Sequence, residues 1–170
     1  RDGKGKTEYF DSIINISGPW ADKLLKQSDV QADYSLDLVR GSHILINQEI
    51  KNGYFLEIPH EVRIFFVLPY KGQTLIGTTE HRQTIDQSIA VSDGEIDYLI
   101  NAYNHYFKTP ISKSDVTQAF AGLRPLIKSA NEPNKITREY AIQKNGKLTT
   151  VFGGKWTTAR QLAKKVLIQI

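Results

Sequence analysis

The sequence predicts an α+β fold in which a mainly antiparallel β-sheet is flanked by helices. Three strand-like segments, residues 54–58, 63–68 and 74–79, follow one another with connections too short for a crossover helix, so they are expected to pair antiparallel. Asn145-Gly146, the strongest short hairpin signal in the chain, joins two further strands. Few segments, the clearest being residues 92–107, have the apolar spacing of a helix. A sheet with helices to one side is typical of α+β domains.

The first part of the chain predicts a strand, a helix and a second strand. Residues 12–16 form a nearly continuous apolar run, as expected of a strand buried on both faces. Gly18 and Pro19 follow, and Pro19 suits the first turn of a helix over the next residues. Gly18 lies where backbone could approach a ligand closely, although a plain helix entry has the same sequence. Residues 36–46 predict a strand, and Gly41 within it indicates a bulge or close packing against another group.

The second part continues the alternation of strands and helices. Ser92 and Glu95 form a capping-box pattern at the start of the helix, which we expect to cover one face of the sheet. Residues 117–126 predict a further strand, and residues 137–143 and 147–152 predict the two strands of the C-terminal hairpin.

Composition bounds the class of protein. The chain has 170 residues, of which 40% are hydrophobic and 24% charged, and these proportions are typical of one soluble domain with a core. The net charge is only +4, so nucleic-acid binding is not demanded, and without cysteine there is no disulfide or thiolate chemistry. No apolar run approaches ~20 residues. The chain lacks methionine and opens at Arg1 in mid-pattern, which leads us to expect a piece of a longer protein.

The stretch from Val151 to Thr158 is the strongest local candidate for a binding site. Gly153 and Gly154 end a strand, and a helix pattern follows at once. Lys155 then falls in the first helical turn, where a cation opposes the helix dipole. That placement is explained if Lys155 and the helix N-terminus face an anion or an electron-rich carbonyl. An ordinary strand-to-helix turn with a solvated lysine is the alternative.

Three cations stand where strands end or bend: Arg124, Arg138 and Lys155. Guanidinium groups bind phosphate or carboxylate bidentately, whereas lysine acts as a point charge, so convergence of the three would form an oxyanion pocket. His43 lies within an apolar strand and is either a satisfied core histidine or a general base near pH 7. No HExxH, clustered metal ligands or GxSxG motif occurs, which leaves metal hydrolysis and serine-triad chemistry without support.

Taken together, the motifs resemble the FAD-dependent, quinone-linked glycerol-3-phosphate dehydrogenases. The matching segments are, in chain order, INISGPW, VRGSHILI, FFVLPYKGQTLIGTTE, EIDYLINAYNHYF, FAGLRPL, ITREY and FGGKWTTARQLA. The resemblance implies the substrate-binding, capping half of a D-amino-acid-oxidase-like FAD oxidoreductase. It also implies oxidation of sn-glycerol 3-phosphate to dihydroxyacetone phosphate, with electrons passed to a membrane quinone by a cytoplasmic enzyme on the inner face of the cell membrane, as a possible homodimer.

The resemblance also assigns roles to residues of this chain. Arg124 and Arg138 would hold the substrate phosphate and the C2 oxygen, with Thr78 beside the substrate. Lys155 would join them or hold the flavin edge, and His43 is the candidate base for the C2 hydroxyl proton. The expected cofactor contacts are Gly18, Pro19, Gly153, Gly154, Lys155, Trp156 and Thr157.

The resemblance divides the chain and leaves a part unaccounted for. Residues 1–28 and 150–170 would be remnants of an FAD-binding domain, and residues 29–149 a substrate-binding sheet domain. The family usually has aspartate at Glu80 and leucine at Trp156. No GxGxxG dinucleotide motif occurs, so we expect a missing N-terminal segment, no activity of this chain alone and weak or absent FAD binding by it.

Two other functions would leave a similar sequence. A glycerol-3-phosphate oxidase, which passes electrons to oxygen, would share the substrate-side motifs. A non-catalytic module for phosphate groups or nucleic acid is the second alternative, but it predicts a contiguous basic stripe with interleaved aromatics. The cations here are instead scattered among glycines and prolines at strand ends, which favours a pocket for a small anion.

Overall fold

The computed structural model describes residues 5–128, 136–137 and 139–170, and the chain forms two compact units. Unit 1 comprises residues 1–37 and 125–170, and unit 2 comprises residues 38–124. The division predicted from the sequence, 1–28 with 150–170 against 29–149, assigns ligands to parts of the chain and stays a prediction. No helix among the described residues is long and apolar enough to cross a membrane.

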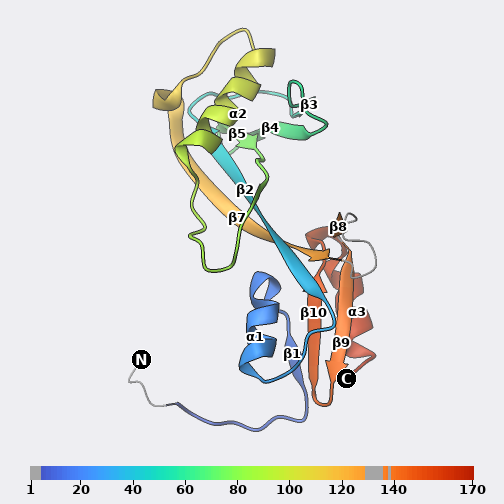
Figure 1. The fold of residues 1–170 in the computed structure, drawn as a ribbon. Coiled ribbons are helices and arrows are strands. Elements are labelled where there is room, and N and C mark those ends of the chain that lie inside the picture. Colours follow the sequence, from blue (N-terminus) through green and yellow to red (C-terminus); the bar gives the residue numbers. More distant parts are fainter. Residues whose placement is uncertain (1–4, 129–135, 138) are drawn as a thin grey trace. The chain divides into compact units, whose positions relative to one another are not determined.

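Unit 2 is built on antiparallel strands (Figure 1). The strands β3 (Tyr54–Glu57), β4 (Ile64–Tyr70) and β5 (Gln73–Gly77) form the predicted meander, and β5 pairs antiparallel with β2 (Ser35–Ile46). The short strand β6 (His81–Arg82) also pairs with β2, and β7 (Val116–Lys128) follows β2 in the sheet order. The prediction of a mainly antiparallel sheet is confirmed.

Helix α2 (Asp93–Tyr106) covers one face of this sheet, as Figure 1 shows. Ser92 caps it through the predicted capping box with Glu95. Because side chains alternate along a strand, only the even-numbered residues Ile44, Ile46 and Ile76 of β2 and β5 reach the helix. They form the main core with Phe65, Val67, Leu99, Ile100, Ala102 and Tyr103. Unit 2 also contains the short 3₁₀ turn η2 (Lys113–Asp115).

Unit 1 has a three-stranded sheet of β1 (Ile13–Asn15), β10 (Leu148–Gly153) and β9 (Tyr140–Asn145). β9 and β10 form the predicted hairpin, whose turn has Gly146 at a φ of 59°. A short strand, β8 (Ile136–Thr137), pairs with the end of β7. Helix α1 (Ala21–Gln27) follows the 3₁₀ turn η1 (Gly18–Trp20), and α3 (Ala159–Leu167) follows η3 (Trp156–Thr158). A small core joins Ala21 and Leu25 of α1 to Ile127 and Phe152.

Two local predictions for unit 1 are wrong. The first strand is not buried on both faces: Ile13 is 51% exposed, Ile14 is also exposed, and only Asn15 is buried. β1 is an edge strand that pairs with β10 alone among the described residues, in parallel. The C-terminal helix also begins later than predicted, at Ala159, because a 3₁₀ turn intervenes, so Lys155 caps that turn and does not lie in the first turn of the helix.

Candidate functional site

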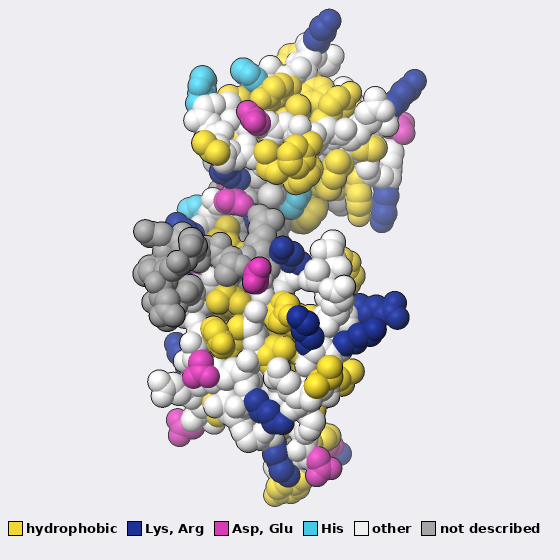
Figure 2. All heavy atoms as spheres, turned by 90° about the vertical axis from the view of Figure 1, so that its right-hand side faces the viewer, with side chains coloured by type: hydrophobic (Ala, Val, Ile, Leu, Met, Phe, Trp, Pro, Cys, Tyr) yellow, Lys and Arg dark blue, Asp and Glu magenta, His cyan; other side chains and the backbone are white. Residues whose placement is uncertain are grey.

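The face of the unit 2 sheet that turns away from α2 carries both His43 and Arg124. His43 pairs with Gly77 and Gly77 with Phe66, and residues paired across strands lie on the same face of a sheet. Gly41 lies two residues before His43 and therefore shares that face. We call this surface the open face. Figure 2 shows hydrophobic side chains exposed on the surface of the molecule. On the open face, the exposed hydrophobic residues of β3 and β4 are Phe55, Ile64, Phe66, Leu68 and Tyr70.

Two glycines make room for these two side chains. A Cβ atom at Gly41 would lie 2.4 Å from Nη2 of Arg124, and one at Gly77 would lie 2.2 Å from Cδ2 of His43. Both separations are far below van der Waals contact, so neither glycine tolerates a larger residue without displacing its neighbour. The sequence indicated a bulge or close packing at Gly41, and the structure shows close packing against Arg124.

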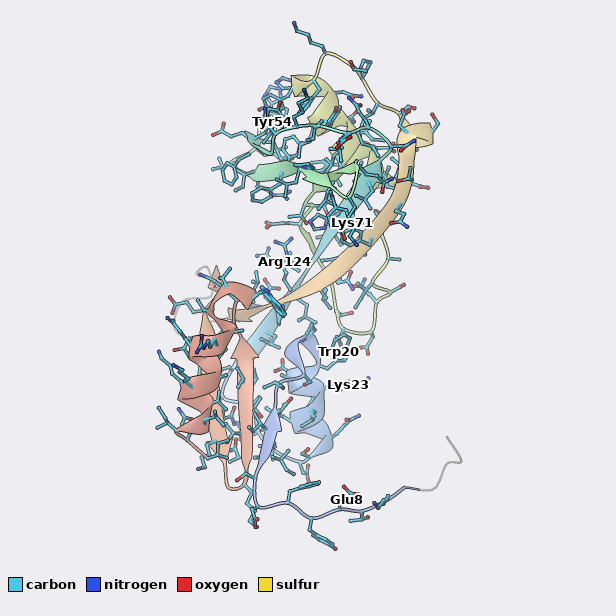
Figure 3. The ribbon with its side chains drawn as sticks, turned by 180° about the vertical axis from the view of Figure 1, so that it is seen from behind. Glu8, Trp20, Lys23, Tyr54, Lys71 and Arg124 are labelled. Atoms are coloured by element: carbon cyan, nitrogen blue, oxygen red, sulfur yellow. The ribbon has the colours of Figure 1, made fainter. Side chains whose placement is uncertain are left out.

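The guanidinium group of Arg124 is held by the segment that follows β5. Figure 3 labels Arg124 on β7, from which its side chain reaches this segment. Nη1 donates to Oε1 of Glu80 at 3.2 Å, and Nη2 donates to the backbone oxygen of Thr79 at 2.9 Å. The hydroxyl oxygen of Thr78 lies 3.5 Å from Nη2. The predicted site residues Arg124 and Thr78 are therefore brought together, and the Arg124 side chain is 29% exposed.

A second arginine supports the same segment from β4's side. Arg63 donates from Nη2 to the backbone oxygen of Thr78 at 3.0 Å, and its Nε lies 3.7 Å from Oε2 of Glu80. Nη1 of Arg63 donates to the hydroxyl of Tyr98, which donates in turn to Glu61. Burial and the hydrogen bond to Glu61 raise the pKa of Tyr98 to about 12, so its hydroxyl stays protonated. Glu80 thus lies between two arginines.

His43 has the properties of a neutral base. Burial, and after it the charge of Arg124, lower the pKa of His43 below 6.5, so the imidazole is neutral near pH 7. Its ring stacks on Phe120 with centroids 5.1 Å apart and planes inclined by 9°. Nδ1 is buried and has no hydrogen-bond partner among the described residues. His43 is therefore not the satisfied core histidine that the sequence left as the alternative.

Glu95 is a buried charge that bonds to Thr79, next to the segment that holds Arg124. Its carboxylate accepts hydrogen bonds from Ser42, Thr79 and Ser92 and pairs with Arg40, whose Nη2 lies 2.7 Å from Oε2. Burial alone would raise the pKa of Glu95, but the hydrogen bonds from Ser42, Ser92 and Thr79 outweigh it and lower the pKa to about 2. The carboxylate is therefore ionised throughout the neutral range.

In unit 1, the segment Gly153–Thr158 combines two glycines of unusual backbone conformation with an exposed lysine, Lys155. Gly153 and Gly154 have φ values of 66° and 98°, in the region that favours glycine, and the amide of Gly154 donates to the oxygen of Glu139. Trp156 is 94% exposed. Lys155 lines a hollow of about 400 Å³ with Tyr140 and Lys165, together with Glu139, Thr158, Gln161 and Leu162.

Gly18 and Pro19, the other predicted cofactor contacts, lie in unit 1 together with the segment Gly153–Thr158. Gly18 and Pro19 form the turn η1 in unit 1, where Gly18 has a φ of 58° and open space beside it. Arg138 lies outside the described residues. Because Arg124 belongs to unit 2 and Lys155 to unit 1, the convergence of the three cations stays a prediction.

Sequence reasoning missed several residues that complete the site. Glu95 was recognised as a helix cap only, and Arg63, Thr79 and Phe120 were not singled out. No local signal marks the contacts of Arg63 with Thr78 or of Phe120 with His43, because these partners lie 15 or more residues apart along the chain. For Glu95 and Thr79 the available signal was a polar side chain at a position expected to be buried between α2 and the sheet.

The antiparallel sheet, with an arginine and a histidine on its open face, is consistent with the substrate-side part of an FAD-dependent oxidoreductase, and the family comparison supports this class. The FAD dependent oxidoreductase family, abbreviated DAO, matches residues 1–160 of the chain. The chain therefore belongs to this family, and the predicted membership and fold are confirmed. Among the described residues, no group of three or more histidine, aspartate or glutamate side chains could hold a metal ion.

Within this family, the chain is similar to dehydrogenases of glycerol 3-phosphate and of D-erythritol 1-phosphate. The chain is 36% identical over 170 residues to the glycerol-3-phosphate dehydrogenase of Pseudomonas aeruginosa, covering 94% of this chain and 33% of that protein. It is also 36% identical over 173 residues to the D-erythritol 1-phosphate dehydrogenase of Brucella abortus, covering 95% and 34%. The crystal structure of the Bacillus halodurans glycerol-3-phosphate dehydrogenase complexed with FAD superposes with a TM-score of 0.81 at 27% identity, covering 93% of this chain and 31% of that one. The chain spans about a third of the length of these relatives.

Proposed function

We propose that this chain is the substrate-side part of an FAD-dependent dehydrogenase that oxidises sn-glycerol 3-phosphate to dihydroxyacetone phosphate. The observation that carries the proposal is the open face of unit 2, where an arginine held by Thr78, Thr79 and Glu80 shares one surface with a neutral histidine. The similarity to a glycerol-3-phosphate dehydrogenase over nearly the whole chain supports the same substrate.

The two side chains divide the work on the substrate. Arg124 binds the phosphate or the C2 oxygen, for which its guanidinium group is oriented in advance by its bonds to Thr79 and Glu80. His43 takes the proton of the C2 hydroxyl, since a neutral imidazole with its pKa below 6.5 accepts a proton at neutral pH. Arg138 and Lys155 complete the set of cations, as the resemblance implies. FAD, when bound, supplies the acceptor for the hydride that leaves C2.

The residues of unit 1 fit a flavin edge. Gly153 and Gly154 have positive φ angles, and at Gly153 the backbone passes so close to Glu139 that there is no room for a Cβ atom. The next two residues are an exposed lysine and an exposed tryptophan. Gly153, Gly154, Lys155, Trp156 and Thr157 would hold the flavin there, with Gly18 and Pro19 along the cofactor. Lys155 and the backbone amides of this turn stabilise negative charge.

We further propose that quinone is the acceptor and that the full-length enzyme associates peripherally with the inner face of the cell membrane. The closest alternative is a glycerol-3-phosphate oxidase. Turnover of the full-length enzyme with a soluble quinone analogue and with oxygen alone separates the two: the oxidase alternative requires hydrogen peroxide at the rate of substrate consumption.

The substrate is tested by anaerobic reduction of the flavin in the FAD-loaded, full-length enzyme. We expect sn-glycerol 3-phosphate to bleach the flavin absorbance and Arg124→Ala to lower kcat/KM about 100-fold, the cost of losing a charged, bidentate contact. Lys71→Ala, which removes an exposed cation from the β4–β5 turn, is the matched control and should change nothing. An Arg124→Ala enzyme with unchanged turnover and affinity removes Arg124 from the site.

D-erythritol 1-phosphate is the second candidate substrate, because a dehydrogenase of that compound is as similar to this chain as a glycerol-3-phosphate dehydrogenase. Both compounds carry a phosphate for Arg124 and hydroxyl groups for His43. The ratio of the two kcat/KM values assigns the substrate.

The 170-residue chain by itself should bind FAD weakly or not at all and should be inactive. No dinucleotide motif that could hold the pyrophosphate occurs in it. Isothermal titration with FAD tests this, and a sub-micromolar dissociation constant contradicts it.

A further inference from the structure

Besides its ion pair with Arg40, the carboxylate of Glu95 makes two sets of bonds, and only one of them serves the helix. Oε2 accepts from the backbone amide of Ser92 at 3.0 Å and from its hydroxyl at 2.9 Å, which together with the return bond forms the helix cap. Oε1 accepts from the hydroxyls of Ser42 at 2.7 Å and Thr79 at 2.8 Å. A helix cap does not require this second set, since Ser42 lies on β2 and Thr79 follows β5.

Thr79 bonds both to Glu95, on the side of the sheet that α2 covers, and to Arg124, on the open face. Its hydroxyl also accepts from the backbone amide of Ser42 at 2.9 Å, and its own amide donates to the backbone oxygen of Ser42. The backbone oxygen of Thr79 accepts a hydrogen bond from Nη2 of Arg124 at 2.9 Å. Thr79 is therefore fixed by Glu95 through its side chain and holds Arg124 through its backbone.

We infer that Glu95 is a positioning residue for Arg124, acting through Thr79. The inference rests on the proposed function only for the identity of the anion that Arg124 binds. Glu95 and Thr79 are both buried, so water cannot replace a lost bond without cost, and removing one partner leaves a buried charge or hydroxyl unsatisfied. With Thr79 displaced, the backbone oxygen moves and Arg124 loses one of its orienting contacts.

The contrast between the two oxygens of Glu95 supplies matched variants. Thr79→Val removes the hydroxyl that bonds to Oε1 and keeps the size and β-branching of the side chain. Thr79→Ser keeps the hydroxyl and should retain the function. Ser92→Ala removes the hydroxyl that donates to Oε2 and accepts from the Glu95 amide, and it leaves both bonds to Oε1, so it should weaken the helix cap and leave Arg124 in place.

The measurement is the dissociation constant of inorganic phosphate for the FAD-loaded, full-length enzyme, with thermal unfolding recorded for each variant. We expect Thr79→Val to raise this constant about tenfold, the effect of one unsatisfied buried hydrogen bond. Thr79→Ser should leave it within about twofold. Ser92→Ala should lower the melting temperature without changing phosphate affinity. If Thr79→Val does not fold, Thr79→Ala, which also removes the hydroxyl that bonds to Oε1, takes its place in the same assay and should act in the same direction.

A double-mutant cycle decides whether the effect passes through Arg124. In an Arg124→Ala background, Thr79→Val should lower kcat/KM for sn-glycerol 3-phosphate no further, because the contact it disturbs is already absent. Additive losses, or a Thr79→Val enzyme with unchanged phosphate affinity, overturn the inference. If the wild-type flavin is not reduced by glycerol 3-phosphate, the proposed function fails, while the phosphate affinities still decide the role of Glu95.

Discussion

The two units hold their candidate binding groups in place in different ways. In unit 2 the candidate groups are side chains, Arg124 and His43, and both are fixed by contacts inside the unit: a segment of backbone and carboxylate holds the arginine, and an aromatic ring holds the histidine. In unit 1 the candidate groups are backbone at Gly153 and Gly154 and the exposed side chains Lys155 and Trp156. A long side chain keeps one orientation only when its neighbours pack or bond to it, whereas a glycine turn is set by the backbone itself.

This difference predicts different sensitivities. Gly41 and Gly77 of unit 2 are required because the side chains of Arg124 and His43 occupy the space above them, so replacing either glycine should damage activity more than stability. Gly153 of unit 1 is required by its own φ angle and by neighbouring backbone, so its replacement should damage stability.

Replacing His43 should have the largest effect. Loss of a general base lowers the rate by a factor of 10² to 10⁴, so we expect His43→Asn to lower kcat about 1,000-fold in the full-length, FAD-loaded enzyme. Because the pKa of His43 is lowered below 6.5, the imidazole protonates only in more acidic solution, and kcat/KM of the wild type should fall along an acid limb below pH 6.5. The pH profile of flavin reduction measures this.

The control for that experiment is His105→Asn, which changes an exposed histidine in the last turn of α2. It should retain both the rate and the acid limb. If the limb persists in His43→Asn, another group accepts the proton.

Glu95 should have the next largest effect, on stability. Its pKa is about 2 in the folded protein against an ordinary value of 4.5, so the unfolded chain binds more protons between these values. Stability from this carboxylate is therefore fully present above pH 4.5 and is lost as the pH falls towards 2, with a total of about 3 kcal/mol. Urea unfolding of the full-length protein at pH 7 and pH 3 should show the larger part of this loss in the wild type and a much smaller one in Glu95→Gln.

Glu80→Gln is the matched control, because the Glu80 side chain is 40% exposed and its ion pairs are screened by water. It should retain most of the acid-dependent loss of stability. A wild type whose unfolding free energy is the same at pH 7 and pH 3 would falsify the assignment of a strongly stabilised carboxylate.

Local signals were sufficient for most of the fold but not for the contacts that make the site. The meander of β3, β4 and β5 and the turn at Gly146 were predicted because they depend on alternation and turn residues over a few positions. The burial of β1 was mispredicted because an apolar run does not reveal whether a strand has one neighbour or two.

The same limit applies to the candidate site. Arg124, His43 and Thr78 were singled out in the sequence, and the structure brings them together around Gly41 and Gly77. That Glu95 bonds to Thr79 could not be predicted, because the capping box accounts for its carboxylate with local partners and gives no reason to look for distant ones. Lys155 was placed one element too late, since a 3₁₀ turn and a helix start have the same apolar and polar pattern.

Gly41→Ala tests whether Arg124 of unit 2 needs the space above this glycine. The added methyl group would lie 2.4 Å from Nη2 of Arg124 and 2.5 Å from the Thr78 hydroxyl, so the guanidinium group must move. We expect kcat/KM for sn-glycerol 3-phosphate to fall about 30-fold, near 2 kcal/mol, with a smaller change in melting temperature. Gly122→Ala, in β7, is the control, because its added methyl group meets no atom within 4 Å. Equal losses in both variants would show that a glycine in a strand matters here for its backbone and not for Arg124.

Gly153→Ala tests unit 1 and should have the smallest effect on the chemistry but a clear one on stability. Its φ of 66° disfavours alanine, and the added Cβ would lie 2.5 Å from the backbone oxygen of Glu139, which accepts a hydrogen bond from the Gly154 amide. Gly146→Ala is the matched control, since its φ of 59° carries the same backbone strain with no atom within 4 Å. Left-handed backbone costs a non-glycine residue about 1 kcal/mol, so Gly146→Ala should lower the unfolding free energy by about that amount and Gly153→Ala by about twice as much. Urea unfolding measures both. Equal losses would mean that the backbone at Glu139 yields to the methyl group, and the contrast between a side-chain site in unit 2 and a rigid backbone site in unit 1 would then fail for unit 1.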